Sequence, residues 1–178
     1  RMGILTNGII LDSQMLSKLS GYLVSGALSL TISLDALTPQ IHDDIRGSSG
    51  AFERTVCGLK ALSCLKSENA GVNFNTISII LNTNLEELLA LAEFLKSLGV
   101  NSIQFHPLLA NNLAMKDRSD RVVYWISEKR WPVLDRVIGE LIIFKKRNPQ
   151  LVRNSEENLS LVKKYFRGKL SRRDVRCR

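Results

Sequence analysis

The strongest constraint on the fold of this chain is the alternation of four strand-like segments with three helical ones. Short apolar stretches typical of strands occupy residues 3–6, 28–34, 72–81 and 100–107. The segments between them carry apolar residues three or four positions apart, as amphipathic helices do. Strands that alternate with helices in this way favour a parallel sheet with right-handed crossovers. The sequence therefore predicts an α/β fold.

The second strand-like segment ends in polar residues that suit a ligand site. Residues 31–36 alternate as a strand, and a polar stretch that we interpret as a loop follows, up to Arg46 and Gly47. Ser33, Asp35 and Arg46 are thereby predicted at the carboxyl end of a strand, the edge at which α/β sheets bind ligands. An ordinary strand end with turn residues explains the same stretch equally well.

The third strand-like segment has a polar face. Asn73 and Asn75 fall on one face of the strand, whereas Phe74, Thr76 and Ser78 fall on the other. Asparagine is disfavoured in strands, so two on one face predict that this face lines a polar cavity. The exposed face of an edge strand is the alternative. A sheet with one face left open is typical of part of a larger barrel.

The alternation of strands and helices ends after residue 109. Residues 110–130 are polar, charged and irregular, which predicts a loop. Two helical patterns follow and end in a basic tail. The predicted divisions are therefore a barrel part over 2–109, a loop over 110–130, and a helical segment with a basic tail over 131–178.

The formal net charge of +8 is compatible with an anionic partner or nucleic acid, because much of it lies near the C-terminus. A solvated tail fits the same composition. No zinc-finger spacing, RNA-binding signature or glycine-rich phosphate loop accompanies the charge, so we do not expect nucleic-acid binding. No apolar run is long enough to cross a bilayer, which predicts no membrane partner.

The three cysteines do not show the spacing of metal ligands. Cys57 and Cys64 lie seven positions apart on one predicted helix, too far for a disulfide. We expect both to be small buried residues. Since nothing in the sequence suggests secretion, we predict a reducing, cytoplasmic location.

Several short motifs follow one another at a distinctive spacing: Thr6-Asn7-Gly8, Ser33-Leu34-Asp35, His42-Asp43, Ile45-Arg46-Gly47 and Gly50-Ala51-Phe52-Glu53. Their order resembles that of the radical S-adenosylmethionine (radical SAM) superfamily, among its iron–sulfur oxidoreductases and maturases. The resemblance covers about residues 2–109. It implies a partial TIM-like (β/α) barrel fragment with parallel strands, followed by C-terminal helices.

The resemblance also implies a chemistry for the full-length parent protein. A [4Fe-4S] cluster would hold S-adenosylmethionine and cleave it reductively to a 5′-deoxyadenosyl radical. That radical would abstract a hydrogen atom from a peptide or from another small-molecule substrate, a cofactor precursor. A flavodoxin or ferredoxin would supply the electron. Among subclasses, a peptide or cofactor maturase is expected first and a molybdopterin-type cyclase second.

By the same resemblance, three residues near the second strand acquire expected roles. Ser33 would hydrogen-bond the ribose or carboxylate region of S-adenosylmethionine, and Arg46 would bind its methionine carboxylate. Asp35 would take a ribose hydroxyl or hold Arg46 in place. His42 is expected to be a loop histidine bonded to backbone rather than a catalytic base, and His106 is open to the same two interpretations.

Four further residues are implied at the barrel interior. Asn7 and Asn75 would line the cofactor side, and Asn73 would meet substrate. Leu109 falls where related enzymes contact the adenine ring of the cofactor.

The sequence departs from the family pattern in two respects. The cluster motif Cys-x3-Cys-x2-Cys is absent, as is the glycine-rich acidic segment that receives the methionine amine. Both would precede residue 1, so we expect an N-terminally truncated chain that binds no cofactor by itself, is inactive, and self-associates through its open face. Cys177 falls where a C-terminal iron–sulfur extension begins in some members.

Two hypotheses from other classes stay open. The chain could be a non-catalytic α/β binding module that uses its basic tail to meet an anionic partner or nucleic acid, with strongly salt-dependent binding. It could also be an ordinary α/β-barrel enzyme that needs no iron, although no acid/base pair supports this.

Overall fold

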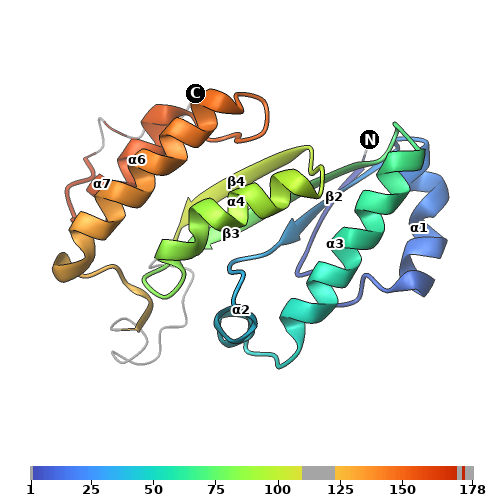
Figure 1. The fold of residues 1–178 in the computed structure, drawn as a ribbon, viewed down its shortest axis with the longest axis horizontal. Helices are drawn as coiled ribbons and strands as arrows, with labels where there is room; N and C mark the ends of the chain where they lie inside the picture. Colours follow the sequence, from blue (N-terminus) through green and yellow to red (C-terminus); the bar gives the residue numbers. More distant parts are fainter. Residues whose placement is uncertain (1, 110–122, 172–173, 175–178) are drawn as a thin grey trace.

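A computed structural model describes residues 2–109, 123–171 and 174 of the chain, and it contains one four-stranded parallel sheet (Figure 1). The strands lie side by side in chain order: β1 (Met2–Thr6), β2 (Leu28–Ser33), β3 (Asn73–Ile80) and β4 (Ser102–Pro107). All neighbouring pairs are parallel. The four predicted strands and their parallel arrangement are confirmed.

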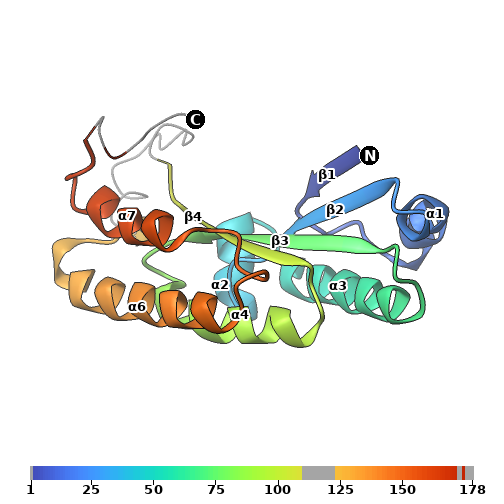
Figure 2. The same cartoon turned by 90° about the horizontal axis from the view of Figure 1, so that it is seen from above.

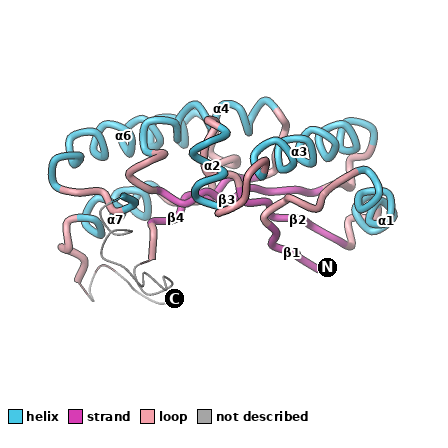
Figure 3. The backbone as a smooth tube through the Cα atoms, turned by 90° about the horizontal axis from the view of Figure 1, so that it is seen from below, coloured by secondary structure: helices cyan, strands magenta, loops and turns pink. Residues whose placement is uncertain are grey.

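The helices of the described residues form two layers around this sheet. Their bounds are α1 (Ser13–Val24), α2 (Pro39–Arg46), α3 (Ala51–Glu68), η1 (Leu85–Glu87), α4 (Leu88–Ser97), η2 (Glu128–Arg130), α6 (Trp131–Arg147) and α7 (Glu156–Phe166). Helices α3, α4 and α6 lie in a row along one side of the sheet (Figure 2). Helix α7 lies on the other side, next to β4 (Figure 3). The predicted C-terminal helices are therefore present.

The two faces of the sheet differ in chemistry because side chains alternate along each strand. Leu30, Ile32, Phe74, Ile103 and Phe105 point to the helix-covered face and are at most 1% exposed. The opposite face, called the open face below, carries Ser29, Thr31, Asn73, Asn75, Ser102 and Gln104. The predicted division of β3 into a polar and a buried face is confirmed.

A short stretch after α6 covers the free edge of β4. Val152 forms a parallel bridge with Ile103, and the Asn154 side chain exchanges two hydrogen bonds of 2.8 Å with the backbone of Phe105. An unpaired edge strand invites association with other chains, and this stretch removes that risk on one side. This pairing has no strand pattern in the sequence, because so few residues take part.

The stretch after β2 that we interpreted as a loop is in part a helix. Helix α2 begins at Pro39, which suits the first turn, and ends at Gly47 with φ +61°. The following helix, α3, begins at Ala51. The prediction of a loop from end to end was therefore wrong.

The prediction that Cys57 and Cys64 are buried was also wrong. Both side chains are exposed. They share one face of α3, as their spacing predicts, but Leu59 and Leu62 occupy the face that packs against the sheet. A spacing of seven residues predicts that two residues share a face of a helix. It does not tell whether that face is buried or exposed.

Part of the C-terminal predictions lies outside the described residues. This holds for 110–122 of the predicted loop, for Cys177 and for most of the basic tail. Among the described helices, none is long and apolar enough to cross a membrane.

Candidate functional site

Asp35 is the centre of a polar cluster at the carboxyl end of β2. Its carboxylate is fully buried, accepts a hydrogen bond from the Ile79 amide (2.9 Å) and forms an ion pair with Arg46 Nη2 (2.5 Å). The first contact extends the pairing of β2 with β3 beyond the last strand residue. The second ties α2 to the sheet. Of the two predicted roles of Asp35, the structure contains the one in which it holds Arg46.

His42 attaches α2 to the same point. The Asp35 amide donates a hydrogen bond to Nδ1 of His42 (3.2 Å), so this nitrogen carries no proton. Burial lowers the pKa of His42, which is completely inaccessible to solvent, and the imidazole is neutral at pH 7. The expected bond to backbone is present, although the residue lies on a helix and not in a loop. His106, in contrast, is exposed on β4.

Asp43 explains the spacing between the motifs on α2 and α3. Its carboxylate accepts hydrogen bonds from the amides of Gly50 (2.6 Å) and Phe52 (2.8 Å), which lie at the start of α3. Gly50 has φ +71°, a conformation that glycine adopts without strain. The aspartate thus caps the next helix from a distance of seven residues, as a side chain from outside the helix.

Asp43 gives the first testable prediction, on the pH dependence of stability. Its hydrogen bonds to the backbone amides, Phe52 foremost, hold its pKa below the ordinary value of 3.8. A carboxyl whose pKa is lower in the folded state stabilises the fold above its unfolded pKa, and this contribution is lost as the pH falls through the folded pKa. We therefore expect Asp43→Asn to lower the free energy of unfolding at pH 7.

The measurement is urea unfolding of both proteins at pH 7 and at a pH below 3.8. The difference between wild type and Asp43→Asn should shrink progressively below pH 3.8 and vanish only once the pH has fallen through the lowered folded-state pKa of Asp43. The surface variant Asp44→Asn is the control and should show no such difference. An Asp43→Asn difference that is equal at both pH values contradicts the prediction.

Sequence reasoning missed two residues that build this region. Asn84 precedes η1, but its side chain makes no cap bond and instead donates to the carbonyls of Asp35 and Ile79 (both 2.7 Å). Glu87 accepts hydrogen bonds from the amides of Leu37 and Thr38 (2.8 and 3.1 Å) and from the Thr38 hydroxyl. Buried asparagine at a strand end is the only sequence signal that could have pointed to this network.

Three polar groups of this cluster have no hydrogen-bond partner within the described part of the chain, and one of them is the buried Nε2 of His42. The Ser33 hydroxyl makes no hydrogen bond, and its side chain is on the open face next to Ile77. The Nε of Arg46 is buried without an acceptor. A guanidinium that uses one nitrogen for Asp35 keeps a second N–H for a carboxylate or hydroxyl. A serine and an arginine with free donors at a strand end fit an oxygen-rich ligand.

Asn7 and Leu109 lie at the same carboxyl edge of the sheet. The Asn7 side chain accepts a hydrogen bond from the Ile9 amide (3.3 Å) in a local turn, and its carbonyl accepts one from Thr55 (2.9 Å). Leu109 follows β4 and is 49% exposed. Next to Asn7, Gly8 has φ +80°, and a Cβ there would lie 2.8 Å from Ile32.

Asn73 and Asn75 are separated from the other predicted site residues. They occupy the beginning of β3, at the amino ends of the strands, and line a different cavity with Ser29 and Ser102. The structure thus brings together Asn7, Ser33, Asp35, Arg46 and Leu109 at one edge. A shared site for all seven predicted residues is not observed, and the roles of the two asparagines stay predictions.

The described residues do not fit an iron–sulfur cluster. Such a cluster takes several thiolates, and no group of three or more His, Cys, Asp or Glu side chains in the described ranges could hold a metal. Cys57 and Cys64 lie on the exposed side of α3.

Sequence comparison finds two informative relatives, whereas no family model matches the chain. The AdoMet-dependent heme synthase of Methanosarcina barkeri (strain Fusaro / DSM 804) is 29% identical over 136 residues, which cover 72% of this chain and 36% of the relative. The antilisterial bacteriocin subtilosin biosynthesis protein AlbA of Bacillus subtilis (strain 168) is 26% identical over 106 residues, 60% of this chain and 22% of the relative. The chain therefore spans about a third of the first relative's length and less of the second's.

Solved structures show the same fold. SuiB of Streptococcus suis, bound to S-adenosylmethionine, matches with a TM-score of 0.57 at 11% identity, over 84% of this chain and 30% of SuiB. Native anSMEcpe with bound AdoMet matches with a TM-score of 0.59 at 15% identity, over 85% of this chain and 39% of that protein. The complex of anSMEcpe with AdoMet and the Cp18Cys peptide gives 0.57 at 14% identity, over 85% and 40%.

The sheet order, the motif spacing and the relatives agree. On α2, the motif residues His42, Asp43 and Arg46 attach the helix to the end of β2 and to the start of α3. These similarities support the radical S-adenosylmethionine superfamily as the family that this chain resembles.

Proposed function

We propose that this chain forms the S-adenosylmethionine-binding edge of a larger enzyme that cleaves this molecule reductively to start radical chemistry. The observation that carries the proposal is that two donors near Asp35, the Ser33 hydroxyl and Arg46 Nε, have no acceptor among the described residues. Arg46 would bind the methionine carboxylate with the N–H that Asp35 leaves free, and Ser33 would bond the ribose or the carboxylate. Leu109 and Asn7 would border the adenosyl group.

A [4Fe-4S] cluster would supply the electron that cleaves the sulfonium bond, and its ligands would come from outside the described residues. The substrate would be a peptide or a cofactor precursor. Two observations support this substrate class. One relative is a heme synthase and the other a bacteriocin biosynthesis protein, and one matching structure contains a peptide.

The test uses the full protein that contains this chain, purified without oxygen and reconstituted with iron and sulfide. With S-adenosylmethionine and dithionite, it should produce 5′-deoxyadenosine. Ser33→Ala removes a hydroxyl without a partner in the described structure, so we expect it to raise KM for S-adenosylmethionine about tenfold with little loss of stability.

Ser17→Ala, on the exposed side of α1, is the matched control and should leave KM unchanged. A protein that makes no 5′-deoxyadenosine after reconstitution contradicts the proposed activity. Equal KM values for Ser33→Ala and wild type contradict the proposed site while leaving the activity in place.

A further inference from the structure

A cavity of about 580 Å³ lies at the amino ends of the strands, opposite the edge that carries Asp35. It is bounded by the start of β3 and β4 and by the turn after α6, residues 149–153. Its volume is in the range of small-molecule sites. None of the functions above uses it.

A chain of hydrogen bonds across three strands forms the floor of this cavity. The Ser29 hydroxyl donates to Asn73 Oδ1 (3.1 Å), Asn75 Nδ2 donates to the same oxygen (3.1 Å), and the Ser102 hydroxyl donates to Asn75 Oδ1 (2.7 Å). Asn75 Nδ2 also donates to the Ser29 hydroxyl (3.2 Å) and lies 3.5 Å from the carbonyl of Leu30, an acceptor, which agrees with this orientation of the amides. The amide oxygens of the floor are therefore occupied.

The same holds for Asn101 at the rim of the cavity. Its Oδ1 accepts from the Phe74 amide (3.1 Å) and from Lys66 Nζ (2.9 Å), two groups that can only donate. The side-chain nitrogens of Asn73 and Asn101 donate to no acceptor among the described residues. The side-chain amides thus offer free N–H donors to the cavity, whereas their oxygens are already used as acceptors.

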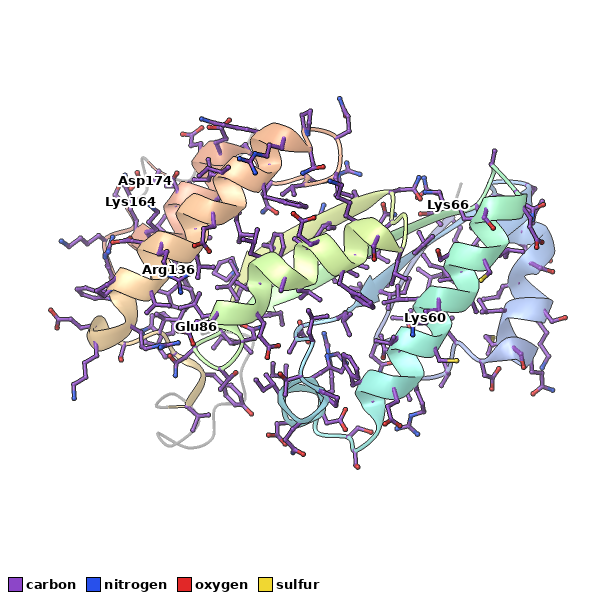
Figure 4. The ribbon with its side chains drawn as sticks, in the orientation of Figure 1. Lys60, Lys66, Glu86, Arg136, Lys164 and Asp174 are labelled. Carbon is purple, nitrogen blue, oxygen red and sulfur yellow. The ribbon has the colours of Figure 1, made fainter. Side chains whose placement is uncertain are left out.

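The charges around the cavity have one sign. Lys145 and Arg153 line it, and Lys66, at the end of α3 in Figure 4, lies behind Asn101. Lys145 Nζ donates to the carbonyls of Pro149 and Val152 (2.7 and 2.6 Å), which fixes its charge beside the cavity. The Arg153 guanidinium has no partner within the described ranges, and no aspartate or glutamate is among the lining residues.

We propose that this cavity binds a phosphate-bearing small molecule, whose dianionic group is held by Arg153, Lys145 and the side-chain amides of Asn73 and Asn101. Cations with free neutral donors and no carboxylate are the arrangement that favours an oxyanion over a cation or a neutral ligand. Two positive charges match a dianion better than a single carboxylate. The site is independent of the proposed S-adenosylmethionine edge, which lies at the other end of the strands.

The test is a titration of the full chain with pyrophosphate, followed by NMR of the side-chain amides and by calorimetry. Asn73→Asp retains the oxygen that accepts from Ser29 and replaces the free amide nitrogen by a negatively charged oxygen. We expect it to weaken pyrophosphate binding by about tenfold or more, and Arg153→Ala by about tenfold. The Arg153 side chain is exposed, so that variant should fold like the wild type.

Lys60→Ala removes an exposed charge on α3 and is the control, with an expected change within about twofold because distant charges are screened (Figure 4). The proposal is supported by saturable 1:1 binding that shifts the amide signals of Asn73 and Asn101. It is overturned by wild-type affinity in both site variants, by non-saturable shifts confined to the basic tail, or by succinate binding as tightly as pyrophosphate.

Discussion

Replacing Arg46 by methionine should lower the free energy of unfolding by about 3 kcal/mol. The side chain of Asp35 is 0% exposed and that of Arg46 19%, so the substitution leaves a buried carboxylate without its cation. Breaking a buried ion pair from one side costs far more than the pair contributes in water, because the remaining charge stays desolvated. Urea unfolding at pH 7 measures the loss.

A double-mutant cycle identifies the cause of this loss. Asp35→Asn keeps an oxygen for the Ile79 amide and removes the charge. The double variant Asp35→Asn with Arg46→Met should therefore lose less free energy of unfolding than the two single variants lose together. Arg136 forms an exposed pair with Glu140 at 3.0 Å, and Arg136→Met should cost only about 0.5 kcal/mol (Figure 4). A cost for Arg46→Met as small as that of the control would refute the argument.

This destabilisation also bears on how activity measurements are interpreted. A variant of Arg46 loses a stabilising contact and a proposed ligand contact at once, so its lost activity does not distinguish the two. Ser33 makes no side-chain hydrogen bond within the described ranges and separates them. The site is thus best tested through Ser33, and the scaffold through Arg46.

The strands were predictable because their signals are local. Alternating apolar residues bounded by glycine or asparagine define β2 and β3 without reference to the rest of the chain. Helix α2 was not predictable in this way, since its eight residues carry few apolar side chains. It is held by His42 and Arg46, which both bind Asp35. Tertiary contacts, rather than helical periodicity, account for it.

The sequence was enough to predict which residues of the candidate site lie at the carboxyl edge of the sheet. It was not enough to tell which other residues lie too far away to belong to the site. Ser33 and Asp35 follow from their position at the end of β2. Asn73 was placed with them because it shares the open face, but it pairs with Ser29, four residues before Ser33. At the rise per residue of a strand, this separates them by about 13 Å. The alternation of side chains along a strand tells on which face of the sheet a residue lies. At which end of the sheet it lies follows only from the register between neighbouring strands.

Among the glycines, Gly71 is the one at which an added methyl group should destabilise the protein most, because the backbone of α1 lies closest to it. Gly71 precedes β3, and a Cβ built there would lie 1.9 Å from the carbonyl oxygen of Val24 at the end of α1. Both partners are backbone, so no side-chain rotation relieves the contact. Gly71→Ala must shift α1 against the start of β3, and we expect a loss of about 3 kcal/mol or more in the free energy of unfolding.

The same substitution should have the opposite sign in α6. A Cβ on Gly139 would meet no atom within 4 Å, and the residue is in the middle of a 17-residue helix. Gly139→Ala should therefore stabilise the protein by about 0.5–1 kcal/mol, since alanine loses less backbone entropy than glycine in a helix. Urea unfolding of both variants tests the pair. If Gly71→Ala is neutral, the close approach of the α1 end to β3 is wrong, and with it the register that sets Ser29 beside Asn73.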